Sequence, residues 1–255
     1  MARTRAYYAE GSLSAAFYDV VAASDPRLSD DVEIYEALAP PGAKVLELGA
    51  GAGRVTAALA AGARQVTGVD IAPAMLAQAV AAKQALPAEV AARVTLRRGD
   101  MTALYLQETF DRVICPFFTL AHVPTGAAWR NTFATAARHL DPGGLAAFHL
   151  PMLEKMRSLG PADSDLPVMD RPLANGGRLL LYLRERSFRE AIGRLEQVIE
   201  YVELDPKGVV ARRSPERLTY YMTDPTPLAA DAGLVLDREP IPLGPAGEIW
   251  VFRKT

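Results

Sequence analysis

The feature that most constrains the fold is a short apolar run that opens directly into a glycine-rich turn. Residues 44–48 read Lys-Val-Leu-Glu-Leu, and Gly49, Gly51 and Gly53 follow them. An apolar run of this length, closed by turn residues, predicts a strand that is buried on both faces. The alanine-rich segment 53–61 then predicts a helix. A buried strand, a glycine turn and a helix together indicate an α/β unit.

The same alternation continues along the chain. Further strands are predicted at 65–69, 93–97, 112–115 and 145–150, further helices at 72–84 and 127–140, and a closing helix and two strands at 225–232, 234–238 and 249–253. Strands that alternate with helices predict a doubly wound, mostly parallel sheet with helices on both faces. Ahead of them, residues 12–38 predict one amphipathic helix that ends at Pro40-Pro41-Gly42.

The pattern changes after Pro151. Segments rich in β-forming residues follow at 178–188, 195–204 and 209–221, with a turn signal at 205–208, Asp-Pro-Lys-Gly. These segments predict an antiparallel β insertion after the fifth strand. The organisation we expect is an N-terminal helical lid at 1–38, an α/β core at 39–150, the insertion at 151–222, and the last helix and strands of the core at 223–255.

Composition excludes several classes of partner. With 28 Lys+Arg against 30 Asp+Glu, the formal net charge is −2, which gives no general attraction to nucleic acid or to acidic lipids. No run of about 18 apolar residues predicts a membrane span. A single cysteine, Cys115, excludes an intrachain disulfide and a CxxC-type zinc site. Residues 1–11 do not read as a signal peptide, so a cytoplasmic location is expected, and no metal site is expected.

Acidic residues end the first three strands of the core: Glu47, Asp70 and Asp100. In an open α/β sheet, ligands bind at the carboxyl ends of the strands. The turn departs from the dinucleotide-binding pattern G-x-G-x-x-G, because Arg54 stands where the third glycine belongs. A carboxylate at Glu47 would repel a pyrophosphate and suit a cationic amino group. Each acid alone could instead cap a helix, Asp100 in particular, and a glycine turn alone could simply close a strand–helix corner.

Four motifs occur in a fixed order: E-L-G-x-G-x-G at 47–53, V-D at 69–70, G-D-M at 99–101 and L-D-P-G-G at 140–144. In these motifs the chain resembles the class I S-adenosylmethionine-dependent methyltransferases over about residues 40–150. The closing run 248–252, Glu-Ile-Trp-Val-Phe, is similar to the last strand of that family. The resemblance implies a Rossmann-like sheet of seven strands, the last of them antiparallel.

The resemblance also implies a site for S-adenosylmethionine. Its methionine part would meet the backbone of Gly49 and Gly51, with Glu47 nearby, and its ribose would meet Asp70. The remaining donor-binding residues implied are Ile71 on the adenine face, Asp100 and Met101 at the adenine edge, Cys115 at the end of the fourth strand, and Tyr18 in a Tyr-Asp step that resembles the family's N-terminal lid.

His122 is the candidate general base, since an imidazole titrates near neutral pH. The segment 116–122, Pro-Phe-Phe-Thr-Leu-Ala-His, resembles that of bacterial small-molecule methyltransferases, including the aminosugar N,N-dimethyltransferase type. His122 could instead cap the next helix or bond a backbone carbonyl. A histidine at the end of a predicted helix, His139, is expected to be structural. The candidates for contact with a small-molecule acceptor are Phe118, His149, Tyr182 and Arg184; Arg186 is expected to share the face of Tyr182 and Arg184.

These observations predict a methyltransferase that acts on an oxygen or nitrogen of a small molecule. Two alternatives are a nucleotide-binding oxidoreductase and a protein that binds S-adenosylmethionine without turnover. The sequence identifies neither the acceptor nor the pathway. An exposed edge of the β insertion makes a homodimer possible.

Overall fold

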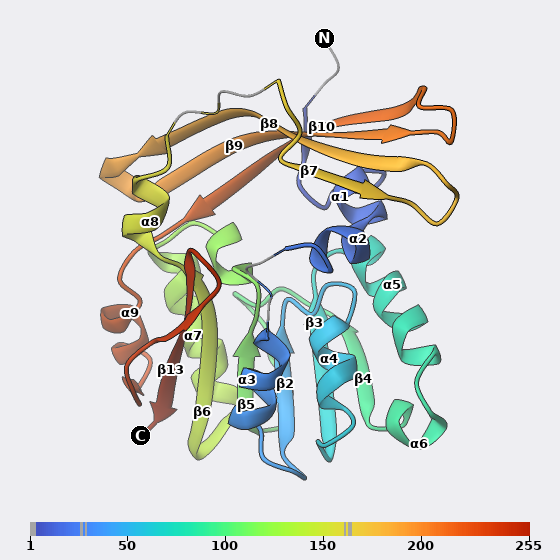
Figure 1. Ribbon diagram of the computed structural model, residues 1–255. Coiled ribbons are helices and arrows are strands. Elements are labelled where there is room, and N and C mark those ends of the chain that lie inside the picture. Colours follow the sequence, from blue (N-terminus) through green and yellow to red (C-terminus); the bar gives the residue numbers. More distant parts are fainter. Residues whose placement is uncertain (1–3, 26–27, 29, 161, 163–164) are drawn as a thin grey trace. The chain divides into compact units, whose positions relative to one another are not determined.

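The computed structural model describes residues 4–25, 28, 30–160, 162 and 165–255. Backbone contacts divide the chain into two compact units. Unit 1 comprises Met1–Ser24 and Leu153–Tyr221, and unit 2 comprises Asp25–Met152 and Met222–Thr255 (Figure 1). Each unit has its own sheet.

The sheet of unit 2 runs in the order β4-β3-β2-β5-β6-β13-β11. Its parallel strands are β2 (Lys44–Leu48), β3 (Gln65–Asp70), β4 (Val94–Arg98), β5 (Phe110–Cys115) and β6 (Leu140–Pro151). Strand β13 (Gly247–Lys254) is antiparallel to β6 and to β11 (Leu234–Leu236). The predicted doubly wound sheet with an antiparallel last strand is confirmed. The short strand β12 (Ile241–Leu243) pairs with β13 and adds an eighth member.

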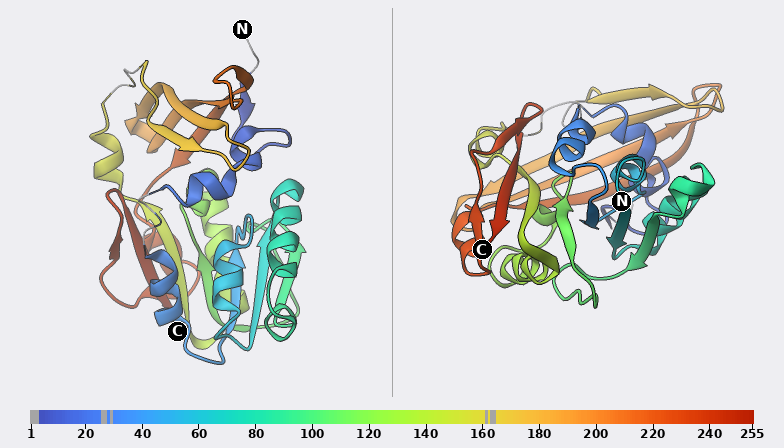
Figure 2. Two further views of the ribbon diagram at one scale, coloured as in Figure 1. Left: turned by 45° about the vertical axis from the view of Figure 1, so that its right-hand side comes forward. Right: turned by 90° about the horizontal axis from the view of Figure 1, so that it is seen from below.

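Helices cover both faces of this sheet (Figure 2). One apolar cluster joins α7 (Ala127–His139) and α9 (Thr226–Ala230) to the strands, and a second joins α3 (Asp31–Leu38) and α4 (Arg54–Leu59). Leu46 belongs to the first cluster and its neighbour Val45 to the second, as the alternation of side chains along a strand requires. Unit 2 also contains α5 (Pro73–Gln84), α6 (Ala88–Ala91) and the 3₁₀ helix η2 (Thr119–His122).

The prediction of one continuous helix over 12–38 is wrong. The chain forms α1 (Leu13–Ala16), α2 (Tyr18–Ala22) and, further on, α3. Phe17, with φ −117° and ψ 28°, separates α1 from α2. Asp25 precedes a proline in the sequence, a position that disfavours helical backbone. The first two helices belong to unit 1 and α3 belongs to unit 2.

The sheet of unit 1 runs in the order β1-β10-β9-β8-β7. Its long strands β8 (Arg178–Arg189), β9 (Arg194–Leu204) and β10 (Val210–Tyr221) are antiparallel, as predicted for the insertion. Strand β7 (Met169–Pro172) extends one edge, and β1 (Arg5–Ala6) pairs parallel with β10 at the other. Two short helices, α8 (Leu153–Arg157) and η3 (Glu190–Ile192), complete the unit. A two-residue strand has too little pattern to be recognised in sequence, so β1 was not predicted.

A register shift in β8 overturns one expectation about side-chain faces. Tyr182 pairs with Glu200, but after a bulge between Leu183 and Glu185, Arg186 pairs with Gln197. Because one extra residue reverses the alternation, Arg186 lies on the face opposite to Tyr182. The prediction that the two residues share a face is therefore wrong.

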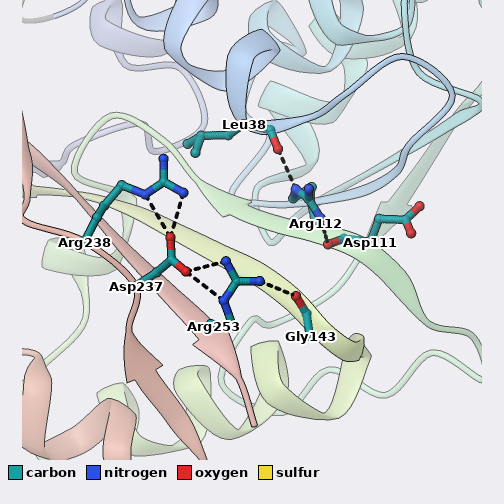
Figure 3. A network of polar contacts seen from close by, with 7 residues as sticks. All are labelled: Leu38, Asp111, Arg112, Gly143, Asp237, Arg238 and Arg253. Atoms are coloured by element: carbon teal, nitrogen blue, oxygen red, sulfur yellow. Dashed lines mark hydrogen bonds and ion pairs between the residues drawn. The ribbon is translucent and has the colours of Figure 1, made fainter.

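The amino ends of the strands of unit 2 carry a polar network (Figure 3). Asp237 accepts hydrogen bonds from Arg238 and from Arg253, at 2.6–2.8 Å, and Arg253 also donates to the carbonyl of Gly143 at 3.1 Å. Arg112 donates to the carbonyl of Leu38, the last residue of α3. Burial of Asp237 opposes ionisation, but the hydrogen bonds from the two arginines hold its pKa below the usual range.

Candidate functional site

The glycine turn lies at the opposite end, where β2 finishes. The backbone N–H groups of Gly49 and Ala50 both donate to the carbonyl of Val69 on β3, at 2.8 and 2.9 Å. Gly49, Gly51 and Gly53 have φ values of 73°, 54° and 82°. This left-handed conformation favours glycine, which explains why glycine recurs at every second position between Leu48 and α4. The result is a tight, hydrogen-bonded turn at the carboxyl ends of two adjacent strands.

Gly49 is constrained by a second segment as well. A Cβ atom at Gly49 would lie 2.1 Å from the Cγ2 atom of Thr119, the first residue of η2. Thr119 in turn donates its hydroxyl to the carbonyl of Pro116 at 2.7 Å. Phe117 and Phe118, between them, have φ values of 49° and 58°, which is strained for aromatic residues. Sequence reasoning did not identify Thr119, because no local pattern signals two consecutive left-handed residues.

Asp70 holds the turn from the side of β3. Its Oδ2 atom accepts from the N–H of Gly51 and its Oδ1 atom from the N–H of Ala72, both at 2.8 Å. Burial raises the pKa of Asp70, and the hydrogen bonds from Ala72 and Gly51 act against that rise. The next residue, Ile71, is 61% exposed, which is unusual for a large apolar side chain at the end of a buried strand. An exposed apolar surface beside a fixed carboxylate fits a nucleoside, which presents a flat base and ribose hydroxyls.

Glu47 lies beneath the turn, with only 2% of its surface exposed. It accepts a hydrogen bond from the hydroxyl of Thr56 on α4. Burial raises the pKa of Glu47 to about 8, against the opposing effects of the Thr56 hydrogen bond and the Arg54 charge. In the free protein this group is therefore mostly protonated at neutral pH. The argument that its negative charge repels a pyrophosphate does not hold in that state, whereas a cationic ligand would favour its ionisation.

Arg54, the residue that breaks the dinucleotide-binding pattern, has a structural partner. Its guanidinium donates to both carboxylate oxygens of Asp31 on α3, at 2.8 and 2.5 Å. Asp31 is almost completely buried. A two-point contact of this kind fixes both the position and the orientation of the guanidinium. The contact therefore ties the first turn of α4, just after the glycine turn, to α3.

Asp100 and Met101 follow the third strand of the core as predicted, but Asp100 also caps the chain locally. Its Oδ1 atom accepts from the backbone N–H and from the hydroxyl of Thr102, both at 2.8 Å. The sequence left open that Asp100 caps a helix, but residues 101–109 form no helix, so these contacts stabilise a turn. Met101 is half-buried and packs against the apolar cluster of α7 and α9. Contacts of the two residues with an adenine remain predictions.

The residues after β5 are mostly buried. The side chain of Cys115 is in the apolar core, where burial raises its pKa well above the usual value, so only its backbone is placed to meet a ligand. Phe118 and His149 are also fully buried, and their ring centres are 4.5 Å apart. A Cβ atom at Gly247 would lie 2.4 Å from Nε2 of His149. This burial does not favour Phe118 and His149 as acceptor contacts.

His122 ends the 3₁₀ helix η2 and is half-buried. It lies in the same segment as Thr119, on the carboxyl side of β5, so unit 2 places it at the end of the sheet that carries the glycine turn. The second histidine of interest, His139, is structural, as expected. Its Nδ1 atom contacts the carbonyl of Thr135 at 2.7 Å and its Nε2 atom accepts from the N–H of Leu106 at 2.8 Å. These contacts require a neutral ring, and burial lowers its pKa.

The candidates in unit 1 are bonded within that unit. Tyr18 is nearly buried, with its ring centre 5.9 Å from that of Tyr8. The guanidinium of Arg184 lies 4.2 Å from the ring centre of Tyr182 and donates to Glu200 at 2.6 and 2.9 Å. Arg184 is thus part of an ion pair on the sheet face. How unit 1 is placed over the donor remains a prediction.

Among the residues that the structure describes, no three histidine, cysteine or acidic side chains come together as a metal site would require. Within the same part of the chain, no helix combines the length and the apolar character needed to cross a bilayer.

Residues 45–144 match the family model described as a methyltransferase domain. This match covers the strands and turns that form the site, so this part of unit 2 is similar to methyltransferase domains. The cofactor of that family is S-adenosylmethionine. No curated protein sequence matches the chain.

Several solved structures share the fold over nearly the whole chain. The CcbJ methyltransferase from Streptomyces caelestis is 23% identical, with a TM-score of 0.75, and the match covers 98% of each chain. The sugar N-methyltransferase KedS8 from Streptoalloteichus sp ATCC 53650 is 19% identical, with a TM-score of 0.73 over 100% of this chain and 98% of its own. The amino pentose methyltransferase CalS10 from Micromonospora echinaspora is 22% identical, with a TM-score of 0.70 over 97% and 98%.

Proposed function

We propose that this protein transfers the methyl group of S-adenosylmethionine to an amino group of a small molecule of the amino-sugar class. The observation that carries the proposal is the glycine turn, fixed by Asp70 and Thr119 at the carboxyl ends of β2, β3 and β5. The names of KedS8 and CalS10, a sugar N-methyltransferase and an amino pentose methyltransferase, support the choice of nitrogen and of the sugar class.

The residues at the turn fit the donor. The backbone of Gly49 and Gly51 lies in the turn where the methionine part of the donor would bind, Asp70 is fixed where ribose hydroxyls would donate, and Ile71 offers an apolar face to the base. Glu47 and Asp70 bring acidic character to a ligand that carries an ammonium and a sulfonium. S-Adenosylmethionine, when bound, supplies a methyl group that is already activated for transfer. The chain's contribution is therefore chiefly to hold the acceptor nitrogen in line with that methyl group and to exclude water.

His122 is the proposed base. An attacking amine gains a bond to carbon while the carbon–sulfur bond breaks and its electron pair stays on sulfur, so the nitrogen must give up a proton before or after transfer. An imidazole accepts that proton near neutral pH. An acceptor hydroxyl would need the same group more strongly, because a neutral alcohol is a weak nucleophile until a base removes its proton. O-methylation is the second candidate at this site.

The test is a methyl-transfer assay over paired compounds that differ only in an amino or a hydroxyl group. We expect turnover with the amino member of each pair. His122→Ala is expected to lower kcat about 100-fold, with the affinity for S-adenosylhomocysteine within twofold of the original protein. His122→Gln, which keeps volume and polarity but cannot titrate near neutral pH, is the matched control for packing. Turnover of the hydroxyl members alone would refute N-methylation, and unchanged rates in both variants would remove His122 from its role.

A further inference from the structure

The segment of unit 2 that follows β5 adopts an uncommon backbone conformation before it reaches His122. Phe117 and Phe118 are both left-handed, with φ values of 49° and 58°. Such a conformation persists in aromatic residues only where the surrounding structure holds it. The side chain of Phe118 is fully buried, and its ring centre is 4.5 Å from that of His149 on β6. Packing within unit 2 therefore fixes the path of the chain into η2.

The helix η2 has a buried face and an open face. Its two central residues, Leu120 and Ala121, are fully buried, whereas its first and last residues, Thr119 and His122, are half-buried. In a 3₁₀ helix, side chains three positions apart lie one above the other on the same face. Thr119 and His122 therefore share the open face of η2. Because they are joined by a single helical turn, a displacement of Thr119 also displaces His122.

Thr119 contacts the glycine turn with one branch of its side chain. Its Cγ2 methyl group fills the space beside Gly49, where a Cβ atom would come within 2.1 Å of it. The other branch, the hydroxyl, donates to the carbonyl of Pro116 at 2.7 Å, and the N–H of Thr119 donates to the same carbonyl at 3.1 Å. The face of η2 that Thr119 and His122 share is thus the face that meets the glycine turn.

We propose that Thr119 is a positioning residue that links the donor site to His122. The inference rests on the proposed function, in which the glycine turn binds the donor and His122 is the base. A ligand bound at the turn restricts the motion of Gly49, and the methyl group of Thr119 transmits that restriction to η2. The imidazole of His122 is then held in one place when the donor is present, which is when a base is needed. Thr119 itself takes no part in proton transfer.

The test is a titration of the full-length protein with S-adenosylhomocysteine, followed by NMR of the imidazole Cε1 protons. The chain has three histidines, and the spectrum of His122→Gln identifies the signal of His122. In the original protein we expect this signal to shift when the ligand binds. Thr119→Ser keeps the hydroxyl that donates to Pro116 and removes the methyl group beside Gly49. When saturated with the ligand, this variant should show less than half of the original shift.

Two further variants make the result specific. Thr119→Val keeps a methyl group beside Gly49, and its backbone N–H still donates to Pro116, so it should retain the larger part of the shift. Thr132→Ser removes the same methyl group from a fully buried threonine of α7, whose hydroxyl donates to the carbonyl of Ala128 at 2.9 Å. We expect the full shift in this variant, which controls for the loss of a buried methyl group elsewhere in unit 2.

Several outcomes would overturn the role of Thr119. Equal shifts in saturated Thr119→Ser and in the original protein would mean that His122 senses the ligand without Thr119. A His122 signal that stays in place when the original protein binds S-adenosylhomocysteine would exclude the link altogether. Loss of the shift in Thr119→Val, or in Thr132→Ser, to the same extent as in Thr119→Ser would show that the methyl group beside Gly49 is not its carrier.

Failure of the proposed function gives a different result. If the original protein does not bind S-adenosylhomocysteine, the donor site is refuted, and the role of Thr119 is refuted with it. Each of the outcomes above, in contrast, is observed with the ligand bound and removes only the link between Thr119 and His122. The titration therefore distinguishes an error in this inference from an error in the proposed function.

Discussion

The two ends of the sheet in unit 2 treat acidic residues in opposite ways. At the amino ends, Glu108 lies 2.8 Å from Lys44, and Asp237 lies between two arginines; in both carboxylates these contacts hold the pKa below the usual range. At the carboxyl ends, Glu47 and Asp70 accept only from a hydroxyl or from backbone N–H groups, and burial raises both pKa values. At the amino ends, Glu108 and Asp237 are paired with basic side chains of the protein. At the carboxyl ends, Glu47 and Asp70 are acidic groups whose charge a cationic ligand would complement.

Glycines with positive φ show the same contrast. Gly42, at the amino end of β2, has a φ of 80°, and a Cβ atom there would meet nothing within 4 Å. Gly49, at the carboxyl end, has a φ of 73°, and a Cβ atom there would overlap Thr119. The backbone conformation is alike, so the difference between them is the close approach of a second segment. This difference gives the sharpest way to separate site from scaffold.

Gly49→Ala should have the largest effect. The added Cβ would need a left-handed backbone and would press on Thr119, so either η2 or the turn must move. We expect the affinity for S-adenosylhomocysteine to fall at least 100-fold, a loss of about 2.7 kcal/mol. Isothermal calorimetry measures it, and circular dichroism checks that the variant is folded.

Gly42→Ala is the matched control for that variant. It introduces the same backbone strain, of order 1 kcal/mol, without any clash. We expect a lower melting temperature and an unchanged affinity for S-adenosylhomocysteine. If both variants lost affinity equally, strain alone would explain the effect, and the close approach of Thr119 would have no functional meaning.

Asp70→Ala should have the next largest effect. It removes the acceptor for the N–H groups of Gly51 and Ala72 together with the proposed ribose contact, and we expect S-adenosylhomocysteine to bind at least tenfold more weakly. Asp70→Asn keeps one carbonyl oxygen and should lose less. Calorimetry with homocysteine, which lacks the ribose, separates the two roles. If only S-adenosylhomocysteine bound more weakly, Asp70 would be assigned to the ribose. If S-adenosylhomocysteine and homocysteine lost affinity equally, Asp70 would be assigned to the turn.

Much of the fold could be predicted because its signals are local. The run 44–48 between turn residues and the alternation of strands with helices give the parallel sheet, and the long β-forming segments after Pro151 give the antiparallel sheet. The break between α1 and α2 could not be predicted, since Phe17 is an ordinary helix residue. Nor could β1, because its pairing with β10 joins residues more than 200 positions apart.

The site was predicted less completely, for a related reason. The acids that end the strands could be placed from sequence spacing, but their protonation could not, because the pKa of Glu47 depends on burial between α4 and the turn. Thr119 and Asp31 were missed, since each acts on the turn through a contact distant in sequence. The alternation that should have joined Arg186 to Tyr182 was defeated by a single bulged residue.

Glu47→Gln should have a smaller effect that depends on pH. The pKa of Glu47 is raised to about 8, so the native state holds a proton that the unfolded chain releases near the ordinary value of 4.5. Stability of the original protein should therefore fall as pH rises from about 4.5 through about 8, and the Gln variant should lose this slope. Urea unfolding between pH 5 and 9 measures it.

The same protonation links Glu47 to the donor. A cationic ligand favours the ionised carboxylate, so its binding releases the proton of Glu47. The affinity of the original protein for S-adenosylmethionine, divided by the affinity of Glu47→Gln for the same ligand, should therefore rise a few-fold from pH 6 to about pH 8. A ratio that is flat with pH would mean that Glu47 supports α4 through Thr56 and does not sense the ligand.

Asp237→Asn, at the amino ends, should leave the site untouched. Because the pKa of Asp237 is lowered in the folded state, its contribution to stability is full above the unfolded value of 3.8 and is lost as pH falls through the lowered folded value. We expect the variant to be about 1–3 kcal/mol less stable at pH 7, with the difference shrinking toward pH 2, as urea unfolding would show. Its affinity for S-adenosylhomocysteine should stay within twofold of the original protein. A larger change would mean that the two ends of the sheet are energetically coupled. The amino ends could then not be treated as a scaffold that is independent of the site.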